Sequence, residues 1–264
     1  MLKKLVIIGI LIVLSANIFA DDAPANNPVA IKKRVLMIVT SNSQMGDSGK
    51  KTGIWAEELA IPYYIFMDAG IEVVLASPKG GVVPYDPESI KPKGMNEAHV
   101  ERFNSDPVAQ QKVTHTLVAS SVDTTSFDAL FFPGGHGAMW DLPNDAGVTH
   151  VVEAAFASNK VIAAVCHGPA GLMTAKRPDG KSILSGKQVS GFTNDEETEV
   201  KLINVVPFTL ENRVLELGGT FKKAPNWQAF AVRDEQLITG QNPNSASLVA
   251  EHVIAALKSK ALEK

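Results

Sequence analysis

The chain has 264 residues, of which 45% are hydrophobic and 20% are charged, with 20 Gly and 15 Pro. This is ordinary globular composition, which excludes collagen-like, low-complexity and wholly disordered chains. The formal net charge of −3 gives no electrostatic footprint for nucleic acid, and a single Cys excludes an internal disulfide, a thiolate zinc site and an iron–sulfur cluster.

The first twenty residues are typical of a secretory signal peptide. Two lysines precede an apolar run over residues 5–14, which is too short to span a bilayer. Cleavage after Ala20 would leave a polar leader over 21–33, followed by a single domain over 34–264. We therefore expect export to the periplasm or secretion, with an uncleaved membrane anchor as the alternative.

Short apolar runs alternate with helical patterns along the rest of the chain. Such runs are typical of strands buried on both faces, and the alternation favours an α/β fold: a doubly wound, mostly parallel, flavodoxin-like sheet with helices on both faces. The predicted elements are strand 34–40, helix 55–69, strands 71–76 and 128–132, helix 148–158, strands 160–165 and 187–192, helix 209–217, strand 236–240 and helix 245–258. Segment 80–114 is long, polar and proline-containing, so we expect a lid-like insertion over one end of the sheet.

Cys166 directly follows the predicted strand 160–165, and a helix is predicted to begin at Gly168-Pro169. With Ala164 and Gly168 on either side, the pattern is typical of a nucleophile elbow, a tight turn that holds a nucleophile in a strained conformation. A helix N-terminus there would also lower the pKa of the thiol. We interpret Cys166 as a nucleophile; the alternative is a buried structural cysteine.

Two histidine-containing turns stand beside this candidate. His167 is predicted to act as a base or thiolate partner oriented by a carboxylate, with helix capping as the alternative. The motif PGGHG at 133–137 ends another predicted strand. Its glycines allow positive φ and leave backbone N–H groups free, so the turn is either a plain strand end or an oxyanion and substrate-binding turn formed by Gly135, His136 and Gly137.

Candidate carboxylates come from two places. Glu57 and Glu58 lie on the predicted helix 55–69, and Asp195, Glu196 and Glu197 follow the strand 187–192. Spacing alone does not choose among them, and any of them could be a solvated surface charge. The remaining histidines show no metal-type spacing, so no metal site is predicted (His99, His115, His150 and His252).

Together these residues resemble the ThiJ/PfpI superfamily, on the class I glutamine amidotransferase-like fold. The resemblance extends in order from about residue 34 to 250, through LMIVTS, KTGIWAEELAIPYY, VVLASPKGG-VVPYDPES, FFPGGHGAMWDLP, AAVCHGPAGL, LSGKQVSGFTNDEE and LITGQNPNSA. AVCHGP together with PGGHG and GFT-x-x-EE is specific. Within the superfamily the chain is most similar to the glyoxalase III and stress-chaperone branch, through KTG-x-x-x-x-E, DPES and the 80–114 insertion.

The resemblance implies a lyase without a cofactor that converts methylglyoxal or glyoxal to a 2-hydroxy acid through a cysteine hemithioacetal, with D-lactate as the product from methylglyoxal. It assigns the nucleophile to Cys166, the adjacent histidine to His167, the helix acid to Glu58 and the third triad member to Glu197, with Glu196 as the competing register. A carboxyl close to the thiol should carry a raised pKa. The well-known relatives work in the cytosol, so an export signal is a departure that puts the physiological substrate in question.

Two other functions remain open. A cysteine peptidase or amidase would use the same triad, and a holdase chaperone or redox sensor would use an oxidisable thiol at Cys166. The expected partners are accordingly a small 2-oxoaldehyde, unfolded-protein clients and a second copy of the chain as a homodimer, with no nucleic acid.

Overall fold

The computed structural model describes residues 32–262, so the predicted signal peptide over 1–20 and nearly all of the leader over 21–33 lie outside the described residues. Residues 32–262 belong to one compact unit. Among the described residues, no helix combines the length and the apolar character that a membrane span requires.

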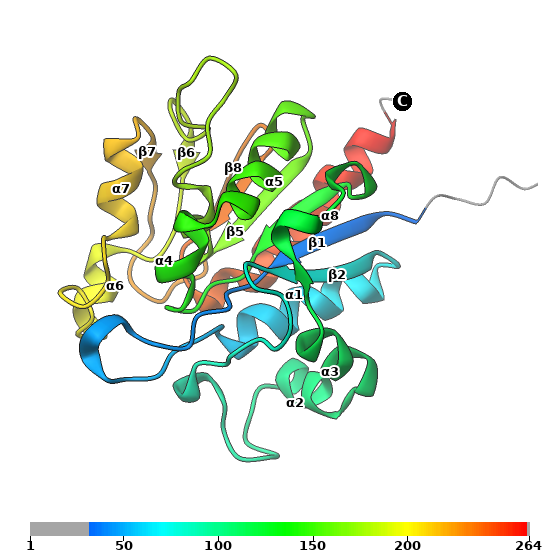
Figure 1. The fold of residues 1–264 in the computed structure, drawn as a ribbon, viewed down its shortest axis with the longest axis vertical. Coiled ribbons are helices and arrows are strands. Elements are labelled where there is room, and N and C mark those ends of the chain that lie inside the picture. The colour runs from blue at the N-terminus through cyan, green and yellow to red at the C-terminus, as the bar shows by residue number, and fades with distance from the viewer. Residues whose placement is uncertain (1–31, 263–264) are drawn as a thin grey trace, which may run out of the picture. The chain divides into compact units, whose positions relative to one another are not determined.

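A seven-stranded sheet forms the centre of this unit, in the order β3-β2-β1-β4-β5-β9-β8 (Figure 1). Neighbouring strands pair in parallel except β8, which pairs antiparallel to β9. The doubly wound, mostly parallel sheet is thus confirmed. The strands are β1 (Arg34–Ile38), β2 (Glu72–Ser77), β3 (Leu117–Val118), β4 (Ala129–Phe132), β5 (Val161–Val165), β8 (Ala231–Asp234) and β9 (Leu237–Gly240).

Helices cover both faces of the sheet. The helices α1 (Ala56–Asp68) and α8 (Ala246–Leu262) pack against each other on one face, and α5 (Ala146–Ala157) packs on β4 and β5 from the other (Figure 1). Every residue of β4 and β5 is buried, which explains why these strands read as unbroken apolar runs. Three short helices complete this part of the chain: α4 (Ala138–Asp141), α6 (Asn194–Glu199) and α7 (Leu210–Glu216).

The predicted strand 187–192 is wrong as a member of the central sheet. Only β6 (Gln188–Val189) is extended, and it pairs with β7 (Thr220–Phe221) in a separate two-stranded sheet. The backbone N–H of Ser190 donates to the side chain of Thr239 at 2.8 Å, rather than to a strand carbonyl. The segment therefore passes beside the central sheet and leads the chain toward α6.

The insertion 80–114 folds into two helices, α2 (Ala98–Ser105) and α3 (Pro107–Thr114), after an irregular stretch. The helix α2 packs against the side of α1, and α3 packs on α2 and β2. Arg102 forms an ion pair with Asp68 at 2.8 Å, and the Tyr64 hydroxyl donates to Asp106 at 2.9 Å. Only the irregular stretch approaches the carboxyl end of the sheet, where Thr52 donates to Asp86 at 2.8 Å. The insertion thus buttresses α1 and contributes one short wall near the strand ends.

Candidate active site

Cys166 lies on a sharp turn between β5 and a five-residue 3-10 helix, Gly168–Leu172. Its φ is 57°, in the left-handed region that residues other than glycine rarely adopt, and only 3% of its surface is exposed. A Cβ at Gly168 would lie 2.0 Å from the carbonyl oxygen of Phe132, so only glycine fits after the turn. This is the strained elbow that the flanking small residues predict.

His167 links the thiol to a carboxylate. Its Nδ1 lies 3.3 Å from the Cys166 sulfur, and its Nε2 lies 2.8 Å from Oε2 of Glu197. Because an ionised carboxylate only accepts hydrogen bonds, Nε2 carries the ring proton and Nδ1 presents a lone pair to the thiol. His167 can therefore accept the thiol proton, and the cysteine, histidine and glutamate form a connected chain.

The structure decides between the two competing glutamates. Thr193 caps α6 through a capping box with Glu196, whose Oε2 accepts from the backbone N–H and hydroxyl of Thr193 at 3.1 and 3.0 Å. Oε1 of Glu196 accepts from Trp227, Gln241 and Asn242 at 2.8–3.0 Å. Glu196 therefore fixes the loop around Trp227, and Glu197 is the residue that reaches His167.

Glu58 approaches the sulfur from the first turn of α1. The backbone N–H of Trp55 donates to the carbonyl of Gly134 at 3.1 Å, which ties the start of this helix to the PGGHG turn. Oε2 of Glu58 in turn accepts from the N–H of Gly134 at 2.8 Å, and the carboxyl interacts with the Cys166 side chain. Glu58 is completely buried, whereas its neighbour Glu57 is only half-buried.

Burial raises the pKa of Glu58 to about 8, although its interactions with Cys166 and with the N–H of Gly134 oppose the shift. The expected raised carboxyl pKa is confirmed. The expectation of a thiol pKa lowered by a helix N-terminus is wrong. The 3-10 helix is only five residues long, and burial together with the Glu58 carboxyl raises the pKa of Cys166. The resting thiol is therefore protonated, and a base must remove its proton before the sulfur can attack a substrate.

The pKa values of both His167 and Glu197 lie below their ordinary values. Burial lowers the pKa of His167 to about 4, with the neighbouring His136 acting in the same direction and Glu197 opposing the shift. Burial would raise the pKa of Glu197, but the two histidines hold it well below its ordinary value. Near neutral pH, Glu197 is an anion that orients a neutral His167.

These side chains surround a small cavity of about 70 Å³. Glu58, Cys166, His167, Gly135 and His136 line it, as predicted from the sequence. Aromatic and apolar residues that the sequence analysis did not single out close it: Trp55, Phe192, Val200, Trp227 and Pro243. The ring of Phe192 packs 4.5 Å from that of His167, between centroids, and 5.7 Å from that of Trp227. The cavity is thus a small, largely apolar space built around the sulfur.

A second space of about 510 Å³ adjoins this cavity. Trp55, His136 and Val200 line both, and the short wall from the insertion, Asp86 to Glu88, lines the larger one together with Lys50 and Lys51. We call this larger space the outer chamber. Because it is larger than the cavity around the sulfur and shares these lining residues with it, the outer chamber provides a route for small molecules to reach Cys166.

The PGGHG turn contributes to the site in a different way from the prediction. The N–H of Gly135 interacts with the Cys166 side chain, and Gly135 has a φ of 102° that favours glycine. Gly137 is wrong as an oxyanion donor, because its N–H already donates to the carbonyl of Gly53 at 3.2 Å and it does not line the cavity. His136 contributes its ring, whose Nε2 lies 2.8 Å from Oε1 of Glu197.

Glu197 and the two histidines are also the one group, among residues 32–262, whose arrangement could hold a metal ion. Their three potential ligand atoms lie within 4.8 Å of one another. Both Nε2 atoms, however, already share their protons with the carboxylate at 2.8 Å, so an ion there would have to displace two short hydrogen bonds. The cluster is satisfied as a hydrogen-bonded unit, and we assign no metal to it.

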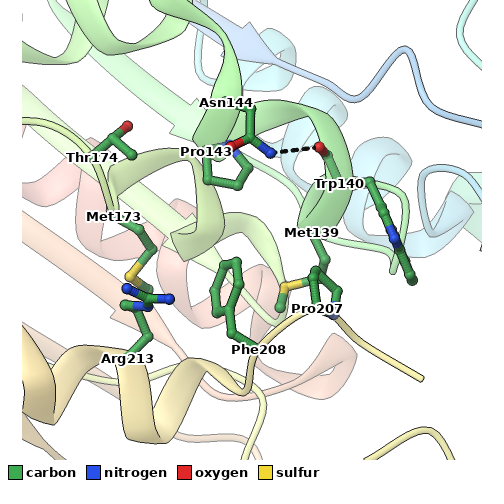
Figure 2. A pocket seen from close by; sticks show the side chains of 9 residues that line it. All are labelled: Met139, Trp140, Pro143, Asn144, Met173, Thr174, Pro207, Phe208 and Arg213. Atoms are coloured by element: carbon green, nitrogen blue, oxygen red, sulfur yellow. Dashed lines mark hydrogen bonds between the residues drawn. The ribbon is translucent and has the colours of Figure 1, made fainter. Parts of the chain in front are cut away.

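Another cavity, of about 300 Å³, lies away from this site (Figure 2). Figure 2 shows Met139 and Phe208 among its apolar side chains, with Arg213 at one side. The Arg213 guanidinium lies 5.0 Å from the centre of the Phe208 ring. The cavity in Figure 2 shares no lining residue with the cavity around Cys166. Its lining residues include no cysteine or serine and no pair of titratable side chains.

Comparison with known families identifies the class of protein to which this sheet and the strained turn at Cys166 belong. Residues 51–256 match the DJ-1/PfpI family, and the chain belongs to that family. It is 31% identical over 233 residues to glyoxalase 3 of Candida albicans, covering 85% of this chain and 98% of that protein. It is 33% identical over 245 residues to a glutathione-independent glyoxalase of Schizosaccharomyces pombe, covering 88% and 98% of the two chains.

Solved structures agree with this assignment. The crystal structure of glyoxalase III from Candida albicans superposes with a TM-score of 0.79 at 30% identity, covering 85% of this chain and 97% of that one. The rapid encystment protein of 24 kDa from Francisella tularensis superposes with a TM-score of 0.81 at 39% identity, covering 85% and 99%. The resemblance noted in the sequence is therefore confirmed over nearly the whole described fold.

Proposed function

We propose that this protein is a glutathione-independent glyoxalase that converts methylglyoxal or glyoxal to the 2-hydroxy acid. The observation that carries the proposal is the buried sulfur of Cys166, which two proton-transferring groups, Glu58 and His167, contact at the wall of a cavity of about 70 Å³. That space suits a molecule of a few heavy atoms, since a water molecule takes up roughly 30 Å³. Relatives that align over nearly all of their own length carry the name of this activity.

The first step joins the sulfur to the aldehyde carbon, C1. The thiol proton passes to Nδ1 of His167, 3.3 Å away, as the sulfur electron pair forms the C–S bond. The carbonyl electron pair moves to the aldehyde oxygen, which takes the proton of Glu58. With a pKa of about 8, Glu58 still holds that proton near neutral pH. The product is a hemithioacetal, and Glu58 is left as a carboxylate.

The second step moves a hydrogen from C1 to C2. The Glu58 carboxylate takes the proton from C1, and the imidazolium of His167 protonates the oxygen on C2, which gives an enediol. Glu58 then returns its proton to C2 while His167 takes the proton of the C1 hydroxyl. The result is a thioester of the 2-hydroxy acid on Cys166, and the N–H of Gly135 is placed to stabilise negative charge near the sulfur.

Product analysis tests the proposal directly. Purified protein is incubated with methylglyoxal in the absence of glutathione, and D-lactate is followed enzymatically for the wild type, Cys166→Ala and Glu58→Gln. We expect D-lactate from the wild type alone. If the wild type forms no hydroxy acid, the glyoxalase assignment fails, and a peptidase panel and a client-aggregation assay with Cys166→Ala then separate the peptidase from the holdase.

We further propose that the chain is exported and acts in the periplasm or outside the cell, as the pattern of residues 1–20 favours. Cell fractionation of a C-terminally tagged chain, with N-terminal sequencing of the product, tests this. An N-terminus near residue 21 in the exported fraction is expected, and an intact Met1 on a membrane-bound product would indicate an anchor. Sedimentation of the same material tests the homodimer.

A further inference from the structure

His136 occupies a position that the two steps above leave unused. It follows β4 directly, and its ring lines both the cavity around Cys166 and the outer chamber. Its ring centre lies 4.0 Å from that of His167, and both rings are bonded to the same carboxylate, Glu197. His136 is therefore the imidazole of the site that lies between the sulfur and the route from solvent.

The hydrogen bond to Glu197 fixes which nitrogen of His136 can act. The Nε2 atom, 2.8 Å from the carboxylate oxygen, carries the ring proton, as in His167. The Nδ1 atom then carries a lone pair, and no residue among 32–262 forms a hydrogen bond with it. The side chain keeps 11% of its surface accessible. A carboxylate-oriented imidazole with a free lone pair beside a solvent route is the arrangement of a general base.

The other two bases of the site already interact with the sulfur of Cys166. Nδ1 of His167 contacts Cys166, and the Glu58 carboxyl is held between the N–H of Gly134 and the Cys166 side chain. Neither of them lines the outer chamber, whereas His136 does. The outer chamber, which shares the His136 ring with the cavity around the sulfur, gives water for the last step a path past this imidazole.

We propose that His136 is the base that activates water to release the 2-hydroxy acid from Cys166. This inference rests on the proposed glyoxalase function. Nδ1 takes a proton from water as the water oxygen attacks the thioester carbon, and the carbonyl electron pair moves to its oxygen. When that pair returns, the C–S bond breaks, its electrons go to the sulfur, and the sulfur takes the proton that Nδ1 of His167, 3.3 Å away, has held since the thioester formed. The proton on His136 passes to the Glu58 carboxylate across the cavity that both side chains line, which restores the resting protonation of the site. Thioester and water thus become hydroxy acid and thiol, with no other reactant.

The test separates formation of the thioester from its hydrolysis. Wild type, His136→Asn and the control His150→Asn, a change at an exposed histidine on α5, are mixed with methylglyoxal and quenched with acid at short times. Intact mass shows the adduct on Cys166, with Cys166→Ala as the blank. Treatment with hydroxylamine after quenching identifies a thioester, because only an acyl group yields the hydroxamate.

We expect His136→Asn to accumulate close to one thioester per Cys166 and to lose roughly 10²–10⁴-fold in steady-state D-lactate formation, the usual contribution of a general base. Added imidazole should restore part of the turnover. Loss of turnover without thioester would overturn the inference, because it would mean that His136 only positions Glu197. If the wild type forms no hydroxy acid, the proposed function itself fails, so the two failures are distinguishable.

Discussion

The Nε2 atom of His167 lies 2.8 Å from Oε2 of Glu197, and this bond sets the direction of proton flow in the site. Glu197 also binds His136 through its other oxygen, so one buried carboxylate orients two imidazoles. Because each histidine donates its Nε2 proton to Glu197, the Nδ1 atom of each ring carries a lone pair that points away from this carboxylate. One lone pair faces the sulfur, and the other belongs to the ring that lines the outer chamber. A single side chain thereby prepares two bases for two different steps.

Glu197→Gln should reduce kcat by about 10²–10⁴-fold with little change in folding. A glutamine can accept from only one of the two histidines, and its NH₂ group faces the other ring, which must then adopt the opposite tautomer. Initial rates of D-lactate formation and thermal unfolding of the same preparations measure the two effects. A kcat close to that of the wild type would show that turnover does not depend on the tautomers of His136 and His167.

The matched control for this change is Asp195→Asn, two residues earlier on α6. Asp195 is exposed and forms a surface ion pair with Lys223 at 3.1 Å. Surface pairs of this kind contribute less than about 1 kcal/mol. We expect wild-type kinetics from Asp195→Asn, so that a loss specific to Glu197→Gln reports on the histidines rather than on the charge of the helix.

The central fold could be predicted because its strands are buried on both faces, and β1, β4 and β5 therefore stand out as apolar runs. The strand β8 carries no such signal, because its residues are at most half-buried and include Arg233 and Asp234, so no apolar pattern marks it. The segment 187–192 does contain a short strand, β6, but its buried residue Val189 packs beside the central sheet, where β6 contacts β8 and β9, and the sequence does not distinguish this position from one within the sheet.

The site was predictable in its members and less so in their roles. Thr193 and Glu196 have the spacing of a capping box, a local signal that could have assigned Glu196 to the helix start and left Glu197 for the histidine. The sequence places His136 in a turn that binds substrate or an oxyanion. Its side-chain role follows from the pairing of β4 with β5, which brings the ends of the two strands together, and a single sequence does not reveal that pairing.

Gly168→Ala should destabilise the protein by more than about 3 kcal/mol, because the new methyl group would lie 2.0 Å from the Phe132 carbonyl oxygen in a fully packed region. The control is Gly180→Ala, where φ is 81° but no atom lies within 4 Å, and backbone strain alone should cost roughly 1 kcal/mol. Urea unfolding measures both. Equal losses in the two variants would contradict the close approach between the elbow and β4.

Chelation should leave the activity unchanged. Glu197 already accepts two short hydrogen bonds from His136 and His167, so the cluster needs no ion to hold its geometry. Dialysis against EDTA followed by assay in metal-free buffer measures this, with metal content determined on the same sample. A loss of D-lactate formation that a divalent ion restores would show that the three side chains work as a metal site instead.

Glu58→Gln should make the protein less sensitive to alkaline pH. Burial raises the pKa of Glu58 from 4.5 to about 8, so between these values the folded chain holds a proton that the unfolded chain has released. The unfolded state then binds fewer protons than the folded state, and the free energy of unfolding falls as pH rises through this range. Glutamine keeps the acceptor for the N–H of Gly134 but does not ionise, so the stability of the variant relative to the wild type should increase from about pH 5 to about pH 8 by a few kcal/mol, at about 1.4 kcal/mol per pKa unit.

Urea unfolding at the two pH values measures the difference, and Glu57→Gln on the same helical turn, where the side chain is only half-buried, should show no such trend. A stability difference that stays constant with pH would mean that Glu58 is already ionised in the folded protein and cannot supply the proton that the first step of the reaction requires.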